Sequence, residues 1–288
     1  MSEHVAIVIP AHNEAVGLDR LLPSLRQHMP NARIVVVDDG STDDTAGVVI
    51  RHGVELISHP YNKGNGASVK AGARATESEI IVFMDADGQH DPADVPVLVR
   101  RLDTGYDMVV GARSWKSQAS IYRGLANSVY NQLASWVVGH PIADLTSGFR
   151  AARRRQFHRF LHMLPNGFSY PATSTMAFFR AGYSVAFEPI EARRRHSATS
   201  HIRPVRDGLR FLLIIFRIGT LYSPLKIFIP VSLGFFLLGV GYYGYTFAAQ
   251  ERFTNMSALL LITSVMVFLV GLVSEQITNL LYRDQETP

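Results

Sequence analysis

The sequence predicts an α/β fold with a mostly parallel sheet, followed by a membrane hairpin. Over residues 5 to about 190, short runs rich in Val and Ile alternate with segments of helical spacing. This alternation is typical of parallel strands covered by helices on both faces. Residues 227–277 instead hold two apolar runs, each long enough to cross a bilayer.

Each expected strand of the first part is a short apolar run that stops at polar or turn-forming residues. The strands are Val5–Ile9, Ile34–Val37, Val54–Ile57, Ile80–Met84 and Met108–Val110. A helix is expected between the first two, because leucines repeat there at helical spacing. They are Leu18, Leu21, Leu22 and Leu25. No repeat or long linker interrupts this part, which we predict to be one domain over residues 1–202.

Composition excludes several kinds of chemistry. The 288 residues include no cysteine, so disulfides, thiolate metal sites and cysteine nucleophiles are excluded. No basic leader precedes the first apolar run, so we expect no cleavable signal peptide and a domain that stays where it is made. Positive charge collects ahead of the apolar C-terminus, which favours an anionic membrane surface over nucleic acid as partner. A solvated basic face remains an alternative for Arg153–Arg155.

The segment 203–226 has the pattern of an amphipathic helix at a membrane interface. Its arginines fall on one helical stripe, at Arg203, Arg206, Arg210 and Arg217. The large apolar side chains lie mainly on other faces, as in helices that rest on a bilayer. A surface helix of the globular domain is the alternative.

Residues 227–288 are predicted to form a two-helix transmembrane hairpin with a short tail. The two spans are Ile227–Ala249 and Met256 to about Ile277, and Gln250–Asn255 join them. Basic residues before the first span and after the second predict a cytoplasmic domain and a cytoplasmic C-terminus. We therefore expect a multi-pass protein of the cytoplasmic (inner) membrane. Arg252 in the short loop argues weakly against this orientation, and buried core helices are the alternative to spans.

Two acidic clusters follow expected strands, and ligands of open α/β sheets bind beyond such strand ends. One is Asp38-Asp39-Gly40-Ser41-Thr42-Asp43, and the other begins with Asp85-Ala86-Asp87. We expect Asp85 and Asp87 to converge on one cation, with Gln89 as a further oxygen ligand. Oxygen ligands select Mg²⁺ or Mn²⁺, whose coordination a substrate's phosphates complete. Asp91 before Pro92 instead indicates a helix cap.

Three further motifs suggest anion chemistry. Lys63-Gly64-Asn65-Gly66 precedes a helical segment, Ala67–Ala75, and glycines at a helix start let backbone approach phosphate. The motif lacks the P-loop ending, which excludes an ATPase of that type, and a plain glycine-rich turn stays open. Arg113 and Arg123 suit a bidentate grip on phosphate. Asp144-Leu145-Thr146-Ser147-Gly148-Phe149-Arg150 is a polar cluster that alone indicates a capped turn.

Four motifs in a fixed order resemble family-2 glycosyltransferases, in particular the polyprenyl-phosphate group typified by dolichol-phosphate mannose synthase. They are Pro10-Ala11-His12-Asn13-Glu14, Asp38-Asp39-Gly40-Ser41-Thr42-Asp43, Asp85-Ala86-Asp87-Gly88-Gln89-His90 and Asp144-x-x-Ser147-Gly148-Phe149-Arg150. The resemblance covers roughly residues 5–226. The paired C-terminal spans match many bacterial members of the group.

The resemblance implies a glycosyltransferase A-type fold that binds a nucleotide sugar, and it implies roles for matching positions. The nucleotide would contact Pro10, Ala11, Glu14, Asp38, Asp39, Lys63 and Asp85. The metal would be held by Asp85, Asp87 and Gln89, and the catalytic carboxylates would be Asp87 and Asp144. The acceptor's phosphate would be bound by Arg113, Arg123 and Ser147. The donor diphosphate would meet Arg195 and His201, where a lysine is usual in place of the histidine.

The function so implied is inverting transfer of a sugar from a nucleotide-diphosphate sugar to a polyprenyl phosphate, with Mg²⁺ or Mn²⁺ as cofactor. Because the acceptor phosphate is already anionic, we expect Asp144 to orient it rather than to remove a proton. Transfer to another lipid, glycan or protein and a processive polysaccharide synthase are alternatives within the fold. A non-catalytic, membrane-tethered nucleotide-sugar-binding protein is an alternative of another class. A homo-oligomer is compatible with two spans per chain.

Overall fold

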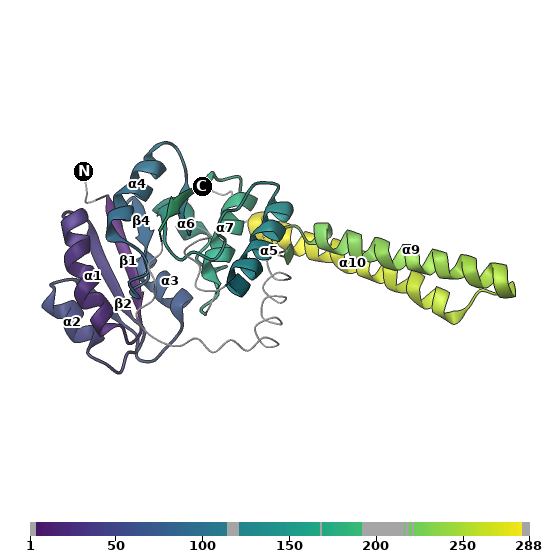
Figure 1. Cartoon of the computed structure of the whole chain (residues 1–288), viewed down its shortest axis with the longest axis horizontal. Coiled ribbons are helices and arrows are strands. Elements are labelled where there is room, and N and C mark those ends of the chain that lie inside the picture. The colour runs from purple at the N-terminus through teal and green to yellow at the C-terminus, as the bar shows by residue number, and fades with distance from the viewer. Residues whose placement is uncertain are drawn as a thin grey trace. The chain divides into compact units, whose positions relative to one another are not determined.

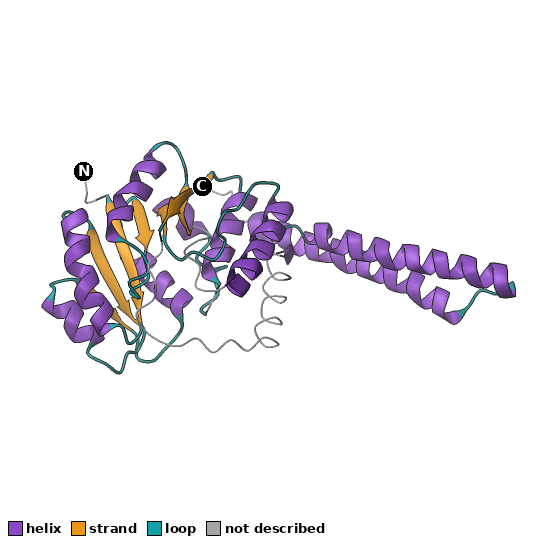
Figure 2. Ribbon diagram, viewed as in Figure 1, coloured by secondary structure: helices purple, strands orange, loops and turns teal. Residues whose placement is uncertain are grey.

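The computed structural model describes residues 4–113, 121–167, 169–191, 216, 219–220 and 222–283, without the side chains of 121–127, 250 and 281–283. The chain divides into two compact units, Met1–Phe211 and Leu212–Pro288. The first unit contains a sheet with helices around it, and the second contains a pair of long helices (Figures 1 and 2). The predicted boundary at residue 202 lies outside the described residues and stays a prediction.

The first unit is built on a seven-stranded sheet of order β3-β2-β1-β4-β6-β5-β7. Neighbouring strands pair in parallel except around β6, which is antiparallel to both β4 and β5. The mostly parallel sheet is therefore confirmed. The strands are β1 (Val5–Ala11), β2 (Arg33–Asp38), β3 (Glu55–Ser58), β4 (Ile80–Phe83), β5 (Met108–Arg113), β6 (Arg150–Arg153) and β7 (Val185–Ile190).

Helices cover both faces of this sheet (Figure 1). The four predicted leucines of α1 are buried in one core with the odd-numbered residues of β1, such as Ile7. On the other face, α3 lies so close to β1 that any side chain at Gly72 would collide with Val8. The helices are α1 (Ala15–His28), α2 (Thr45–Arg51), α3 (Asn65–Ala75), the 3₁₀ turn η1 (Pro92–Asp94), α4 (Val95–Asp103), α5 (Ile121–Val138), α6 (Arg154–Arg159) and α7 (Tyr170–Arg180).

The five predicted strands are all present, with ends shifted by up to three residues, whereas β6 and β7 were missed. The sequence of β6 is Arg-Ala-Ala-Arg, which has no β-branched or aromatic residue. It becomes a strand because β4 and β5 pair with it on both sides, a tertiary effect that outweighs its low propensity. The apolar run of β7 is interrupted by Glu188 and Pro189.

The second unit is a helical hairpin of α9 (Pro224–Gln250) and α10 (Asn255–Arg283). Both helices are long and apolar enough to cross a membrane, which agrees with the two predicted spans. Buried Ser232 and Ser264 join them, since each hydroxyl donates to the other residue's carbonyl oxygen at 2.9 Å. Most of the predicted interfacial segment 203–226 lies outside the described residues.

Candidate active site

The loops that follow β1 and β2 are tied together at the carboxyl edge of the sheet. Asn13 has a left-handed backbone (φ 57°), and its Oδ1 accepts a hydrogen bond from the Thr42 N–H at 2.8 Å. Its own N–H donates to the Ser41 hydroxyl at 2.9 Å. Pro10 and Ala11, the buried end of β1, lead directly into this network. Asn13 was not among the predicted site residues, although asparagine is one of the few residues that tolerate this conformation.

The two aspartates at the end of β2 have different partners. The carboxylate of Asp38 accepts from the Ser41 N–H at 3.0 Å. Asp39 is 3% exposed, and one of its oxygens accepts from His59 Nδ1 at 2.7 Å and from the Lys63 N–H at 2.9 Å. Its other oxygen accepts from the Gly64 N–H at 2.7 Å. Asp39 therefore anchors the loop that leads into α3.

The glycines of the Lys63–Gly66 motif meet protein backbone rather than open space. A Cβ on Gly64 (φ 100°) would lie 2.6 Å from the carbonyl oxygen of Asn166, and one on Gly66 would collide with that of Pro165. The same Asn166 oxygen accepts from the Ala67 N–H in the first turn of α3. Both glycines therefore let the 165–167 segment approach closely. The predicted approach of a phosphate to this loop stays a prediction.

The acidic motif after β4 lies against the Asp144–Arg150 segment. A Cβ on Gly148 would be 2.8 Å from Asp85 Oδ2, so only glycine lets the segment pass this close. Asp87 Oδ1 accepts from the Gln89 N–H at 3.1 Å, which shapes the turn that carries both residues. Asp85, Asp87 and Gln89 are all half-buried. The fold thus brings together two motifs that lie about sixty residues apart in the chain, because β4 and β6 are neighbouring strands.

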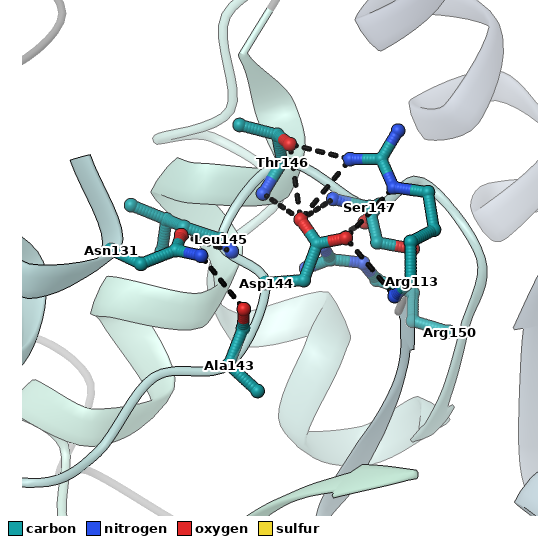
Figure 3. Close-up of polar contacts among 8 residues, drawn as sticks. All are labelled: Arg113, Asn131, Ala143, Asp144, Leu145, Thr146, Ser147 and Arg150. Carbon is teal, nitrogen blue, oxygen red and sulfur yellow. Dashed lines mark hydrogen bonds and ion pairs between the residues drawn. The ribbon is translucent and has the colours of Figure 1, made fainter. Parts of the chain in front are cut away.

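Arg113, at the end of β5, grips Asp144 through a two-pronged ion pair (Figure 3). Its Nε donates to Oδ2 at 2.8 Å and its Nη2 to Oδ1 at 3.1 Å. Thr146 and Ser147 also donate backbone N–H bonds to Oδ1, at 3.0 and 3.1 Å. Burial alone would raise the pKa of Asp144, but the hydrogen bonds and charge of Arg113 hold that pKa below its ordinary value. Asp144 is therefore an ionised carboxylate with its oxygens occupied.

Helix α5 fixes the backbone on both sides of Asp144 (Figure 3). The Asn131 side chain donates to the Ala143 carbonyl oxygen at 2.7 Å and accepts from the Leu145 N–H at 3.0 Å. The predicted phosphate ligand Arg123 belongs to the same helix, although its side chain is outside the described residues. Beside Arg113, the polar side of α5 lines a cavity of about 450 Å³.

His90, the last residue of the acidic motif after β4, is buried against the Asp144–Arg150 segment. It is 4% exposed and stacks on Phe149 at a ring-centroid distance of 4.9 Å. Burial lowers the pKa of His90 to about 4, so the ring is neutral at physiological pH. Across the described parts of the chain, three buried side-chain atoms have no hydrogen-bond partner, and all belong to this neighbourhood: His90 Nδ1, Ser147 Oγ and Arg150 Nε. Such atoms are rare in folded proteins and mark places where a ligand or water is expected.

The structure thus places most predicted site residues along one edge of the sheet. The ends of β1, β2 and β4 carry the predicted nucleotide and metal ligands, and the end of β5 carries Arg113. Within residues 4–113, 121–167, 169–191 and 222–283, no group of three or more His, Cys, Asp or Glu side chains is arranged to hold a metal. Arg195 and His201 lie outside the described residues, so their predicted contact with the donor stays a prediction.

Two family models match the chain, in separate parts. The model of glycosyl transferase family 2 matches residues 6–161. The model of the GtrB C-terminal hairpin matches residues 223–280, which covers nearly all of α9 and α10.

Similar curated proteins include bacterial sugar transferases. The undecaprenyl-phosphate 4-deoxy-4-formamido-L-arabinose transferase of Photorhabdus laumondii is 31% identical over 52% of this chain, and the match spans about half (49%) of that protein. The protein of the same name from Pseudomonas savastanoi pv. phaseolicola is 27% identical over 94% of this chain and 84% of its own length. The putative glycosyltransferase CsbB of Bacillus subtilis is 25% identical over 99% and 89%.

Among solved structures, glucosyl-3-phosphoglycerate synthase from Mycobacterium tuberculosis, in complex with Mn²⁺, uridine diphosphate and glucosyl-3-phosphoglycerate, has a TM-score of 0.59 to this chain. The match covers 74% of this chain and 77% of that one, at 23% sequence identity. At this identity the likeness shows the fold alone, and it confirms the predicted glycosyltransferase A-type architecture.

Proposed function

The chain belongs to glycosyl transferase family 2, and from this membership we propose that it transfers a sugar, with inversion, from a nucleotide-diphosphate sugar to a polyprenyl phosphate. The product is a polyprenyl-phosphate sugar. The names of the Photorhabdus and Pseudomonas relatives, which are undecaprenyl-phosphate sugar transferases, support this acceptor class. The matching hairpin model supports a membrane-bound enzyme.

The observation that carries the proposal is that a motif suited to bind a cation lies beside a motif suited to bind an anion. Asp85 and Asp87 stand on one side, where a cation with a diphosphate fits, and the Arg113–Asp144 pair stands on the other, where a second phosphate fits. The negative charges of Asp85 and Asp87 both act to raise the pKa of Arg113, so the two sides are electrostatic neighbours. A transferase that joins a sugar diphosphate to a phosphate acceptor needs these two anion sites beside each other.

The donor side fits a divalent metal together with the donor's own phosphates. Two half-buried carboxylates at i, i+2, plus the Gln89 side chain, are too few oxygens to enclose an ion. They suit Mg²⁺ or Mn²⁺, which use one or two carboxylates and substrate phosphates. When bound, such an ion stabilises the negative charge that develops on the leaving nucleoside diphosphate. Pro10, Ala11, Glu14 and Asp38 border the nucleoside in this arrangement.

On the acceptor side, Asp144 positions Arg113 rather than taking a proton. The bidentate pair turns the guanidinium so that Nη1, which has no hydrogen-bond partner among the described residues, is the group left to bind the acceptor. Arginine offers paired N–H donors in a rigid plane, which matches phosphate oxygens. A phosphate monoester is largely dianionic at neutral pH, so its oxygen can attack the anomeric carbon without a general base.

The hairpin gives the enzyme access to an acceptor whose tail stays in the bilayer. We propose that α9 and α10 span the cytoplasmic membrane and that the catalytic unit faces the cytoplasm, because Lys226 precedes the first span and Arg283 follows the second. The cysteine-free chain allows a direct test by single cysteines at Arg252 and Asp103. In intact cells, an impermeant maleimide should label R252C alone, and labelling of D103C alone would reverse the orientation.

The proposed reaction is tested with the purified full chain in detergent, undecaprenyl phosphate, and Mg²⁺ or Mn²⁺. UDP-glucose, GDP-mannose and related donors are offered separately, and transfer of labelled sugar to the lipid is followed. We expect one donor to give a labelled lipid, with the product lost in EDTA and in the Asp87→Asn variant. Diacylglycerol serves as the alternative acceptor.

Each other outcome has its own meaning. Transfer to diacylglycerol but not to undecaprenyl phosphate would replace the acceptor class. Full turnover in EDTA would remove the metal from the mechanism. Donor hydrolysis without a lipid product would move the acceptor elsewhere, and no turnover with a complete donor panel would favour the non-catalytic alternative.

A further inference from the structure

Arg150, the first residue of β6, is a cation buried completely inside the protein. It is 0% exposed and is the largest fully buried side chain among the described residues. Its Nη1 donates to the Pro171 carbonyl oxygen at 2.9 Å, the Ser174 hydroxyl at 2.7 Å and the Thr175 hydroxyl at 3.1 Å. Its Nη2 donates to the carbonyl oxygen of Ser147. These four partners, and the Met108 sulfur at 3.9 Å, are all uncharged.

Burying a charged guanidinium destabilises the folded state, so we looked for a function that explains why Arg150 is buried. Buried charges are normally paired, because the desolvation of an unpaired charge is strongly unfavourable. Within the described residues, no carboxylate lies within ion-pair distance of Arg150. Burial lowers the pKa of Arg150, while the negative charges of Asp144 and Asp85 act on it in the opposite direction. Its counter-charges are therefore the acidic groups of the active site, at a distance.

Hydrogen bonds connect Arg150 to the metal-binding side of the site. Arg150 holds the carbonyl of Ser147, and the next residue, Gly148, is the one that packs against Asp85. The Tyr170 hydroxyl donates to the Gly148 carbonyl oxygen at 3.0 Å, and the guanidinium lies 5.7 Å from the centre of the Tyr170 ring. The start of α7 is thereby tied, through Arg150 and Tyr170, to the carbonyl groups of Ser147 and Gly148, and Gly148 lies beside Asp85.

We propose that Arg150 is a positioning residue for the donor–metal site: it fixes Ser147 and Gly148 against Asp85 and supplies positive charge behind the acidic cluster without occupying the carboxylate oxygens. This inference rests on the proposed function, which assigns Asp85 to the metal. An arginine paired directly with Asp85 would compete with a metal for the carboxylate oxygens. Arg150 makes no such ion pair, so it leaves those oxygens available to a metal. Groups that orient metal ligands in this way typically change metal affinity when they are removed.

The same strand provides a matched control. Arg153 is the last residue of β6, three residues after Arg150, and it is also an arginine. Its Nη1 lies 3.0 Å from Glu79 Oε1, and the Glu79 side chain is 60% exposed. This is a surface ion pair at the opposite edge of the sheet, and such pairs contribute little to stability. A change at Arg153 therefore alters charge and strand sequence but leaves the active site alone.

The experiment measures Mn²⁺ affinity in the presence of UDP by electron paramagnetic resonance, with the full chain in detergent. The variants are Arg150→Met, Arg150→Lys and the control Arg153→Met, and thermal unfolding of each is recorded. We expect Arg150→Met to weaken Mn²⁺ binding by about tenfold or more, as for other residues that orient metal ligands. Arg150→Lys keeps the charge and should recover part of the affinity, while Arg153→Met should match the wild type.

Kinetics separates positioning from general loss of structure. In Arg150→Lys, the KM for the donor should rise more than the KM for the polyprenyl phosphate, since the donor side depends on Asp85. If Arg150→Met does not fold, Gly148→Ala tests the same contact from the other end and should also weaken Mn²⁺ binding. Wild-type-like Mn²⁺ affinity in folded Arg150→Met, or in both Arg150→Lys and Gly148→Ala, overturns the inference alone. No Mn²⁺ binding by the wild type overturns the metal part of the proposed function as well.

Discussion

The ends of β2 and β4 carry similar acidic sequences but use them differently. At β2, Asp39 is 3% exposed and accepts hydrogen bonds from one histidine and two backbone N–H groups. At β4, Asp85 and Asp87 remain half-buried, near the Arg113–Asp144 ion pair and the buried Arg150. The first carboxylate holds a loop in place, and the second pair faces the region where a ligand fits.

The difference teaches that strand-end position alone does not make an aspartate a ligand. What decides is the set of donors that the surrounding loops aim at it. The 59–64 segment, which connects β3 to α3, presents the His59 ring and the Lys63 and Gly64 N–H groups to Asp39. After β4, the chain turns at once, the Gln89 N–H donates to Asp87, and Asp85 lies beside Gly148 of the neighbouring segment.

The largest expected effect comes from Asp87. The Asp87→Asn variant removes a carboxylate from the proposed metal site, and we expect kcat/KM to fall by about 1000-fold. The unfolding midpoint should stay close to that of the wild type, because the substitution preserves size and a hydrogen-bond acceptor. Asp103→Asn, an exposed change at the end of α4, is the control for both measurements. A large drop in midpoint with little drop in rate would give Asp87 the anchoring role that we assign to Asp39.

Asp144 should show the next largest effect, through Arg113. Asp144→Asn breaks the bidentate ion pair, so the Arg113 guanidinium is no longer held in the orientation that binds the acceptor. We expect kcat/KM for the polyprenyl phosphate to fall by about 100-fold. The rate should not recover at high pH, because the low pKa of Asp144 already excludes it as a base that titrates near neutrality. Rate–pH profiles of the variant and of Arg113→Lys check this. Recovery in alkaline buffer would restore proton abstraction as the role of Asp144.

Asp39 should affect stability more than chemistry. In Asp39→Asn, an amide N–H replaces an acceptor that faces backbone N–H groups, so we expect a loss of about 2 kcal/mol in unfolding free energy. Asp44→Asn, at an exposed ion pair with Arg51, should cost less than about 1 kcal/mol. Thermal and denaturant unfolding in detergent measure both. A raised donor KM with an unchanged midpoint would show instead that Asp39 contacts the nucleotide.

The same residue predicts a dependence of stability on pH. Burial would raise the pKa of Asp39, but the hydrogen bonds from His59, Lys63 and Gly64 outweigh it and leave the folded-state pKa below the ordinary value. A lowered folded-state pKa means that the stabilisation is complete above the unfolded-state pKa and is lost as pH falls through the folded-state pKa. The wild-type midpoint should therefore fall in acid, and Asp39→Asn should show less of this fall.

Much of the fold followed from local pattern, and the exceptions have physical causes. The Val- and Ile-rich strands and the α1 leucines were predictable because each buries a face that its own sequence marks as apolar. β6 was not, because its Arg-Ala-Ala-Arg sequence becomes a strand only between β4 and β5. The buried place of Arg150 depends on the same pairing, so no local signal could reveal it.

The candidate site was predictable in membership more than in contacts. The resemblance to the family implied that Asp85, Asp87, Arg113 and Asp144 belong to one site. It did not reveal that Arg113 and Asp144 bind each other, nor that Asn131 holds the backbone around Asp144. These contacts join segments from different parts of the chain, and spacing along the sequence carries no information about them.

The smallest expected effect tests whether the glycines of the Lys63–Gly66 motif serve packing or ligand binding. A Cβ on Gly66 collides with the Pro165 carbonyl, so Gly66→Ala should lose about 1–2 kcal/mol of stability as the two segments move apart. Gly167→Ala is the matched control on the facing segment, since a Cβ there meets nothing within 4 Å, and it should change stability by less than about 0.5 kcal/mol. Unfolding midpoints decide between packing and ligand contact. If Gly66→Ala kept its midpoint but bound UDP weakly, Gly66 would contribute to phosphate binding. The loop that Asp39 anchors after β2 would then bind ligand as well, as we propose for the residues after β4.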